Sequence, residues 1–252
     1  MNDLHAYKNG YSTLPNLKKI NVDNIFEKNY NNDSFLIQRE KKEALENQKY
    51  FFEYNNPSFF YEICEDFIKK NYPRKLQSNK YLDIAKEIDE DLIIHRIENN
   101  KDYTSSIHVC FPSHWLPEEK IGKSFDQIHQ PVPMNLKNSS KLVGAIINNG
   151  IFERFVWSVI YEKKYNSHPR FESKKFNKNK PEFYVKVERQ ITVGFPEHQF
   201  CLFILRQYII EEKDIDKKSL LNSIKSMEDN HKKYKSLLSQ NDLLDYLNSS
   251  AP

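Results

Sequence analysis

Charged side chains alternate with apolar ones along residues 183–193, which read FYVKVERQITV. Side chains of a strand point to opposite faces in turn, so Lys186, Glu188 and Gln190 would share one face. Arg189 would lie on the other face with the valines. A carboxylate enclosed on such a face could bind an amine or move a proton. The residues equally allow a solvated face that carries Lys186 and Glu188, with Arg189 paired to a carboxylate, so both interpretations stay open here.

Two histidines lie in a proline-rich segment at residues 111–133, FPSHWLPEEKIGKSFDQIHQPVP. Prolines this close together break helices and strands, and a simple connection needs fewer residues. Neutral imidazole is a common ligand of heme iron, so His114 and His129 are both candidates. A lone histidine is more often structural, and no HExxH pattern or His/Cys cluster supports a zinc site. The segment alone predicts a rigid functional loop.

A basic segment at residues 163–181, KKYNSHPRFESKKFNKNKP, interleaves cations with aromatic residues. This pattern can mark nucleic-acid binding, although a solvated loop is the commoner explanation. The net charge is +3, from 38 Lys and Arg against 35 Asp and Glu. Because this balance is close to neutral, charge alone does not point to nucleic acid, and we do not expect such a partner.

Composition argues against several classes of protein. The 252 residues include five glycines and no GxGxxG or GxxxxGK[ST] pattern, which argues against Rossmann and P-loop nucleotide sites. Three separated cysteines without a CxxC pair argue against a zinc ribbon and fit a reducing compartment. Neither a signal peptide nor an apolar run of about 20 residues is found. We therefore expect a cytoplasmic protein without a membrane partner.

Hydrophobic periodicity predicts the elements that must position the candidate residues. Helices are expected at 57–73, 80–93, 136–150 and 216–247, and strands at 105–113, 154–162, 183–193 and 199–210. The short link between the last two strands predicts an antiparallel hairpin. The fold class is expected to be α+β, with helices on one side of a small sheet. Residues 1–50 are expected to form an arm and a short helix, and residues 51–247 a single domain.

The proline-rich loop resembles a motif of the family of the α subunit of heme-dependent oxidative N-demethylase. Its members tend to read Pro-Ser-x-Trp, then Glu-Lys-x-Gly, then Ile-His-x-Pro-Val-Pro. The matching residues here are Pro112, Ser113, Trp115, Glu119, Lys120, Gly122, Ile128, His129, Pro131, Val132 and Pro133. VERQITVGFP at 187–196 and the pair Tyr234-Lys235 are also similar to the family pattern. The resemblance covers roughly residues 50–240.

This resemblance implies a PAS-like antiparallel sheet, elaborated with N- and C-terminal helices, that holds one heme b per chain. The implied reaction is oxidation of a small methylated amine such as dimethylamine by O2, with release of formaldehyde. The electrons would come from NADPH through FMN and an iron–sulfur cluster, all carried by reductase subunits, and a folate-binding subunit would capture the formaldehyde. The alternative is a non-catalytic PAS-like module that binds heme as a sensor or contacts a partner protein.

The resemblance also implies roles for individual residues. His129 is the expected axial ligand of the heme iron, with His114 as the second choice. Glu188 is the expected catalytic residue, which would bind the substrate ammonium. The residues expected to bind the cofactor, by pairing with its propionates or by walling the pocket, are Lys120, Arg154, Arg189, Trp115 and Trp157, together with His129.

The chain departs from the family pattern at a few positions. Val156 stands where the family usually has asparagine, and Val193 and Gly194 stand where it usually has two arginines. The predicted fold depends less on these positions than the predicted heme and substrate do.

Overall fold

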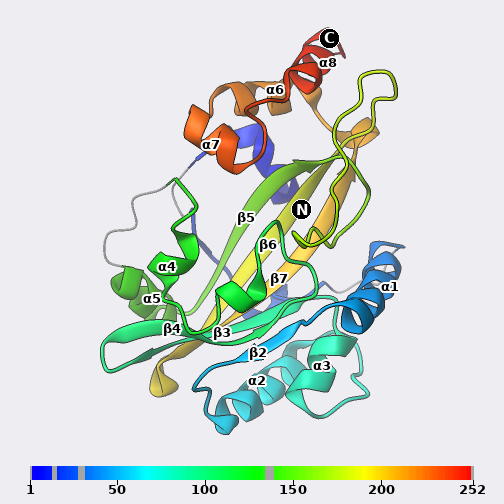
Figure 1. Cartoon of the computed structure of the whole chain (residues 1–252). Coiled ribbons are helices and arrows are strands. Elements are labelled where there is room, and N and C mark those ends of the chain that lie inside the picture. Colours follow the sequence, from blue (N-terminus) through cyan, green and yellow to red (C-terminus); the bar gives the residue numbers. More distant parts are fainter. Residues whose placement is uncertain (1, 13–15, 28–31, 134–138, 251–252) are drawn as a thin grey trace.

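A single antiparallel sheet forms the centre of the molecule (Figure 1). The computed structural model describes residues 2–12, 16–27, 32–133 and 139–250. Within these ranges the sheet has seven strands in the order β1-β5-β6-β7-β3-β4-β2. The strands are β1 (Lys18–Lys19), β2 (Phe51–Glu53), β3 (Asp91–Glu98), β4 (Lys101–His108), β5 (Ile151–Ile160), β6 (Tyr184–Phe195) and β7 (Phe200–Glu211).

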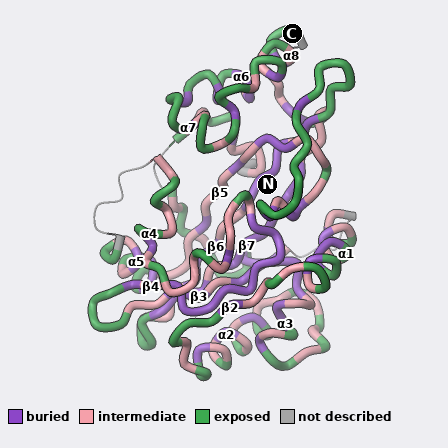
Figure 2. Tube along the Cα trace, viewed as in Figure 1, coloured by how far each residue is buried: buried purple, intermediate pink, exposed green. Residues whose placement is uncertain are grey.

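Helices pack around this sheet. The α-helices are α1 (Asn32–Asn47), α2 (Ser58–Asn71), α3 (Tyr81–Glu87), α4 (Phe125–His129), α5 (Ser139–Asn148), α6 (Lys217–Lys225), α7 (Asp229–Tyr234) and α8 (Asn241–Ser250). Short 3-10 helices are η1 (Asn2–Asn9), η2 (Val22–Asn24), η3 (Pro117–Glu119), η4 (Pro196–His198) and η5 (Glu212–Asp214). The strands are largely buried and the helices expose their outer sides (Figure 2).

Apolar contacts cover both faces of the sheet. On one face, η1 and the C-terminal helices pack over Val185 and Val187 of β6, while α2 and α3 cover the neighbouring part of the sheet. On the other face, α1 contacts Ile160 and Ile209 at one end, and α5 contacts Cys201 at the other end. The expectation of helices on one side only is wrong, because both ends of the second face carry apolar side chains that need cover.

Most of the predicted elements are present, and the α+β class is confirmed. The helix predicted at 57–73 is α2, and the strands predicted at 183–193 and 199–210 form the antiparallel hairpin of β6 and β7. In the helix predicted at 136–150, residues 136–138 lie outside the described residues, and the rest forms α5. The predicted C-terminal helical segment is divided into α6, α7 and α8.

The helix predicted at 80–93 is wrong beyond Glu87. Helix α3 ends there with Ile88 in an extended conformation, and Leu92 lies in β3 between β4 and β7. A central strand that is covered on both faces has a continuous apolar run instead of alternation. Such a run can match helical spacing by chance, which explains the error.

Residues before position 50 contribute to the same sheet and core. Strand β1 pairs with β5, and Tyr7 is fully buried in the cluster under the C-terminal helices. The buried Lys41 ammonium of α1 donates hydrogen bonds to the carbonyls of Ile88 and Glu90 over 2.8 and 2.7 Å. The division of the chain at residue 50 stays a prediction.

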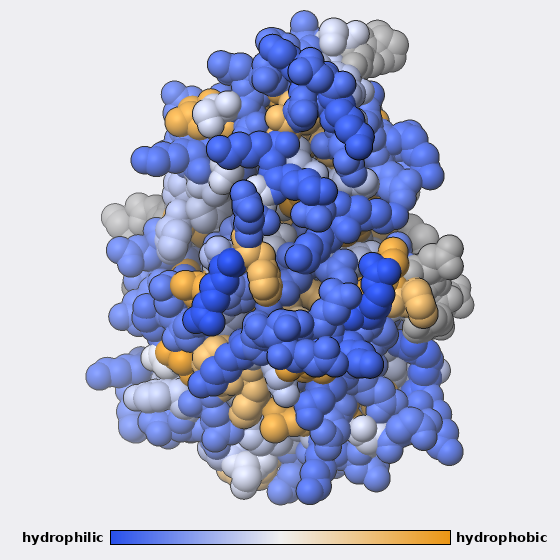
Figure 3. Space-filling model, turned by 45° about the vertical axis from the view of Figure 1, so that its right-hand side comes forward, coloured by the Kyte–Doolittle hydropathy of each residue, from blue (hydrophilic) through white to orange (hydrophobic). Residues whose placement is uncertain are grey.

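The surface in Figure 3 is mainly hydrophilic, with apolar side chains in separate areas between charged ones. The three cysteines, Cys64, Cys110 and Cys201, are all buried and free. In the described ranges, no helix has both the length and the apolar content that crossing a bilayer requires.

Candidate functional site

A cavity of about 1320 Å³ lies over the polar middle of the sheet, between the contacts made by α1 and α5. Its floor comes from three neighbouring strands, because Arg154 of β5 is opposite Gln190 of β6 and Glu188 of β6 is opposite Gln207 of β7. Paired residues of antiparallel strands point to the same face. Segments 113–132 and 158–175, η1 and the end of α7 complete the wall.

Glu188 is held at this floor by neutral amides. The Gln207 Nε2 donates to its Oε2 over 2.6 Å, and the Gln190 Nε2 donates to its Oε1 over 2.5 Å. Glu188 is 9 % exposed. These neutral donors orient the carboxylate, and the cations of Arg154, Lys186 and Lys235 lie near enough to interact with it.

Arg154 brings a guanidinium to the same floor. Its Nε is buried and has no hydrogen-bond partner among the described residues. Burial lowers the pKa of Arg154, while the negative charge of Glu188 opposes that shift. An arginine with an unsatisfied donor in a cavity is suited to an anionic group such as a carboxylate.

Lys235 follows α7 and adds a cation to the wall. Its Nζ donates to the carbonyl of Trp157 over 2.5 Å and lies 5.6 Å from the ring centroid of Tyr11 in the N-terminal segment. Burial lowers the pKa of Lys235 to about 8, and the positive charge of Arg154 adds to this effect. The pair Tyr234-Lys235 was a weak motif in the sequence, but nothing in it indicated a cavity position.

His129 ends α4 and lines the cavity, and its Nε2 has no hydrogen-bond partner among the described residues. Its Nδ1 donates to the carbonyl of Phe125 over 2.7 Å, and the two rings lie 4.1 Å apart. Burial lowers the pKa of His129 to about 4, although the hydrogen bond to Phe125 opposes this shift. The ring is therefore neutral at pH 7, and its Nε2 lone pair is left as the atom that can coordinate a metal.

The other candidate residues of the proline-rich loop also line the cavity. The Lys120 Nζ donates to the carbonyl of Ile128 over 2.9 Å, which connects the middle of the loop to α4. Trp115 packs against the apolar cluster that includes Ile107 of β4. His114 has a positive φ of 62°, and burial lowers its pKa.

Arg189 and Trp157 lie differently from the other candidates. Arg189 is on the opposite face of β6, where its Nε donates to Glu153 over 2.6 Å and its Nη1 donates to the carbonyl of Ile25 over 3.0 Å. Trp157 borders the cavity, but its ring packs against Tyr7 in the apolar core. The structure thus brings Glu188, Arg154 and the loop residues together and leaves Arg189 outside.

A comparison with family models identifies the family of this chain. The model of the family described as "Haem-dependent oxidative N-demethylase, alpha subunit-like" matches residues 50–244. The chain belongs to this family. The resemblance seen in the proline-rich loop is therefore confirmed, and the chain is an oxidative N-demethylase α-subunit-like protein. No curated protein sequence matches the chain.

Packing explains one departure from the pattern of this N-demethylase-like family. A Cβ atom at Gly194 would lie 2.1 Å from the carbonyl oxygen of Ile147 in α5. Val193, on the opposite face, is buried in the apolar cluster under α2 and α3. Side chains as large as arginine therefore fit neither position, and neither position lines the cavity.

The described residues include one group that could in principle hold a metal ion. Asp91, His108 and Cys110 are buried, with ligand atoms within 4.8 Å of one another. However, the Lys41 ammonium lies 3.9 Å from the Asp91 carboxylate, and that carboxylate accepts the amides of Cys110 and Phe111. Because Lys41 already balances the charge of Asp91, an ion pair explains the group without a metal.

Much of the charge of the basic segment at 163–181 is paired within this N-demethylase-like chain. Four of its cations lie 2.5 to 3.6 Å from carboxylate oxygens: Lys163 with Glu211, Arg170 with Glu118, Lys174 with Glu162 and Lys178 with Asp242. Paired cations offer less attraction to a phosphate backbone, which favours a solvated loop over a nucleic-acid site.

Proposed function

We propose that this chain binds one heme b in the cavity and oxidises a small methylated amine. One observation carries the proposal: a histidine Nε2 and an arginine Nε, both without a hydrogen-bond partner among the described residues, line the same cavity as a buried carboxylate. The cavity of about 1320 Å³ is larger than the ~300–1,000 Å³ of an ordinary small-molecule pocket, so it has room for a cofactor and a small substrate.

The residues of the cavity fit the chemistry of a heme. His129 would hold the iron through Nε2, because its Nδ1 is already used by the carbonyl of Phe125. Arg154, Lys120 and Lys235 bring positive charge that would attract the two propionates. Trp115 would form part of the apolar wall. Arg189 has no part in the proposed site, since it pairs with Glu153.

Glu188 would bind and orient the amine. A small secondary amine is protonated at neutral pH, and its ammonium can donate hydrogen bonds to a carboxylate held at the cavity floor. Gln190 and Gln207 fix the direction of that carboxylate. Bound heme would supply the activation of O2 at its iron. The overall reaction consumes the methylated amine, O2, two electrons and two protons, and gives the demethylated amine, formaldehyde and water.

A partner protein would supply the electrons for this reaction, since the sequence has no nucleotide-binding or iron–sulfur motif of its own. We infer reductase subunits that carry NADPH, FMN and an iron–sulfur cluster, and a folate-binding subunit that captures formaldehyde. The α-subunit-like family description supports partner subunits in general. A PAS-like fold and a cytoplasmic location belong to the same proposal, and the antiparallel sheet with helices at both ends supports the former.

Heme titration of the purified protein tests the proposal. We expect a Soret band at one heme per chain that is shifted or lost in His129→Ala and unchanged in His114→Ala. An unchanged band in His129→Ala would exclude His129 as the ligand, and no specific band in the wild type would exclude heme binding.

A turnover assay distinguishes a demethylase from a heme-binding module without catalytic activity. Here O2 and NADPH consumption would be measured with dimethylamine and a suitable reductase, together with formaldehyde release. The valine at position 156, opposite Glu188, is the observation that favours the alternative. If heme binds and no methylated amine accelerates consumption, the chain is a heme-binding module without demethylase activity.

A further inference from the structure

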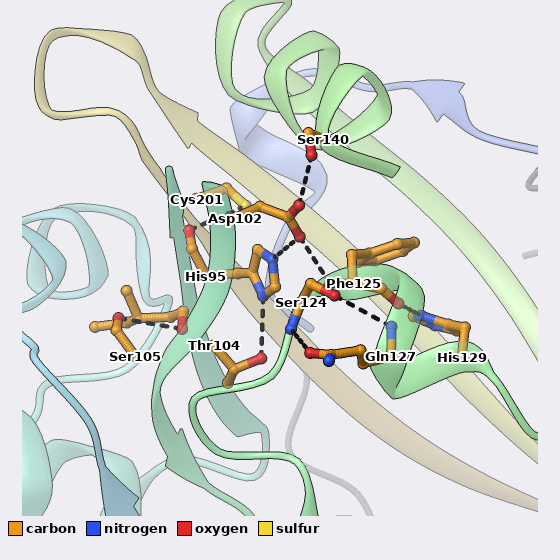
Figure 4. Close-up of polar contacts among 11 residues, drawn as sticks. His95, Asp102, Thr104, Ser105, Ser124, Phe125, Gln127, His129, Ser140 and Cys201 are labelled. Atoms are coloured by element: carbon orange, nitrogen blue, oxygen red, sulfur yellow. Dashed lines mark hydrogen bonds and ion pairs between the residues drawn. The ribbon is translucent and has the colours of Figure 1, made fainter. Parts of the chain in front are cut away.

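We propose that Asp102 is a positioning residue for His129, acting through the backbone of Phe125. The amide of Phe125 donates to Asp102, and the carbonyl of the same residue accepts the hydrogen bond that selects the free nitrogen of His129. This inference rests on the proposed role of His129 as the axial ligand. Figure 4 shows the chain of contacts from the sheet to the imidazole.

Asp102 connects three elements with one carboxylate. Its Oδ2 accepts from the His95 Nε2 over 2.9 Å and from the Phe125 amide over 2.7 Å. Its Oδ1 accepts from the Ser140 hydroxyl at the start of α5 over 2.9 Å. Asp102 is 5 % exposed. Burial alone would raise its pKa, but these hydrogen bonds together lower the pKa to about 2, so the carboxylate is charged at neutral pH.

His95 is fixed in one orientation behind Asp102. Its Nδ1 lies 3.0 Å from the hydroxyl of Thr104, and its Nε2 faces the carboxylate. His95 is 1 % exposed. Because a charged carboxylate must accept, His95 donates from Nε2 and accepts from Thr104 through Nδ1. The three side chains therefore form a rigid group on the β3–β4 hairpin.

Helix α4 needs such an anchor. It has five residues, and helices this short are not stable on their own. A capping box provides hydrogen-bond partners for backbone amides at its start. Ser124 Oγ accepts the amide of Gln127, and Gln127 Oε1 accepts the amide of Ser124. The bond from Phe125 to Asp102 joins this capped turn to β4, beside the contact of the Phe125 ring with Phe203 of β7. It thereby sets where His129, at the other end of α4, meets the cavity.

The histidine tautomers of the heme-free protein test the inference directly. In ¹⁵N-histidine NMR spectra, with His129 assigned by the loss of its signals in His129→Ala, the wild type should show His129 protonated at Nδ1 only. Asp102→Asn should give a mixture of the two tautomers. In the heme-loaded protein, the same variant should lose heme about 10- to 100-fold faster, the usual effect of removing a group that orients a metal ligand.

Asp126→Asn is the matched control, because Asp126 is an exposed acid on the same short helix. It should keep the tautomer of His129 and the rate of heme loss. Loss of stability alone would move the melting temperature of Asp102→Asn but not the tautomer of a folded sample. A His129 that keeps Nδ1 protonated in folded Asp102→Asn would overturn the inference.

Two further outcomes are distinguishable. If Asp102→Asn does not fold, Thr104→Val is tested in its place, since it removes only the hydroxyl that contacts His95. A mixture of tautomers at His129 in this variant supports the inference, and a single tautomer overturns it. If the wild type binds no heme, the proposed function fails, while the tautomer comparison still decides whether Asp102 positions His129.

Discussion

Glu188 and Gln207 face each other across the β6–β7 ladder, and the Gln207 amide donates to the Glu188 carboxylate over 2.6 Å. Gln207 is 2 % exposed, so this bond is shielded from water. The bond fixes the direction of a carboxylate that lies in the interior of the protein. Four predictions follow from this site and from the elements that surround it.

Glu188→Gln should weaken amine binding and leave heme binding intact. The substitution keeps the size of the side chain and removes the charge that the ammonium requires. Loss of one partner of a buried charged pair costs about 3 kcal/mol, or roughly 10²-fold in kcat/KM. Steady-state formaldehyde release and the Soret band would be measured together. Glu197→Gln, at an exposed turn, should change neither. Full activity in Glu188→Gln would remove this residue from the mechanism.

Arg154→Met should weaken heme binding and stabilise the heme-free protein. The buried Nε of Arg154 has no partner, and leaving such a donor unsatisfied costs about 1–3 kcal/mol. We therefore expect a Tm higher by about 2–4 °C per kcal/mol gained, with a heme affinity lower by about tenfold. Differential scanning calorimetry and heme titration test the two halves. Arg170→Met, on an exposed loop, should leave heme affinity unchanged. A lower Tm for Arg154→Met would show that its guanidinium is satisfied.

Acid should destabilise the heme-free protein through His129. Its pKa is lowered to about 4 in the folded state, against about 6.5 in an unfolded chain. Between these values the unfolded state binds more protons, so the free energy of unfolding falls as the pH drops from about 6.5 towards 4. At pH 5, protonation of His129 lowers the free energy of unfolding by about 2 kcal/mol relative to pH 7.

Urea unfolding at pH 7 and pH 5 measures this effect. His129→Gln should lose about 2 kcal/mol less than the wild type over this interval. His198→Gln, in an exposed turn, should behave like the wild type. Equal losses in the wild type and His129→Gln would mean that the His129 ring is not held in its neutral form. The buried His95 and His108 also make the free energy of unfolding fall as the pH drops, because burial lowers the pKa of each.

Gly194→Ala should destabilise the fold, whereas Gly144→Ala should not. A Cβ atom at Gly194 would meet the Ile147 carbonyl at 2.1 Å, while one at Gly144 would meet only a methyl group of Ile97 at 3.8 Å. Moving α5 away from β6 should cost about 1–3 kcal/mol. Alanine at helical Gly144 should add up to about 1 kcal/mol. Thermal unfolding of both variants tests this; an equal Tm for both would contradict the close approach of α5.

The local pattern of the sequence was sufficient for part of the site. Strand alternation separated Glu188 and Gln190 from Arg189, and the register of β6 confirms that separation. The proline-rich motif identified His129 and Lys120, and both line the cavity. The alternation depends only on neighbours in the chain, whereas His129 and Lys120 came from the resemblance to the family, and their roles in binding heme stay predictions.

The remaining part of the site depends on contacts between distant segments. Lys235 reaches the cavity because the C-terminal helices fold back over β5, and Tyr11 meets it from the opposite end of the chain. The amides of Gln207 and Gln190 act on one carboxylate only because β6 and β7 pair in this register. Asp102 and Phe125 are 23 residues apart. No periodicity in the sequence encodes such distances, so the pattern alone did not indicate these roles.

Tyr7 has a consequence for where this protein can be shortened. Its hydroxyl accepts the amide of Asp216 over 3.1 Å, its carbonyl accepts the hydroxyl of Ser223, and its ring packs against Trp157. The family match begins only at residue 50. A chain that begins at residue 50 would keep every residue of the proline-rich motif. It would lose the contacts of Tyr7, which lies between β5 and α6. We therefore expect the shortest chain that folds cooperatively to begin before residue 50.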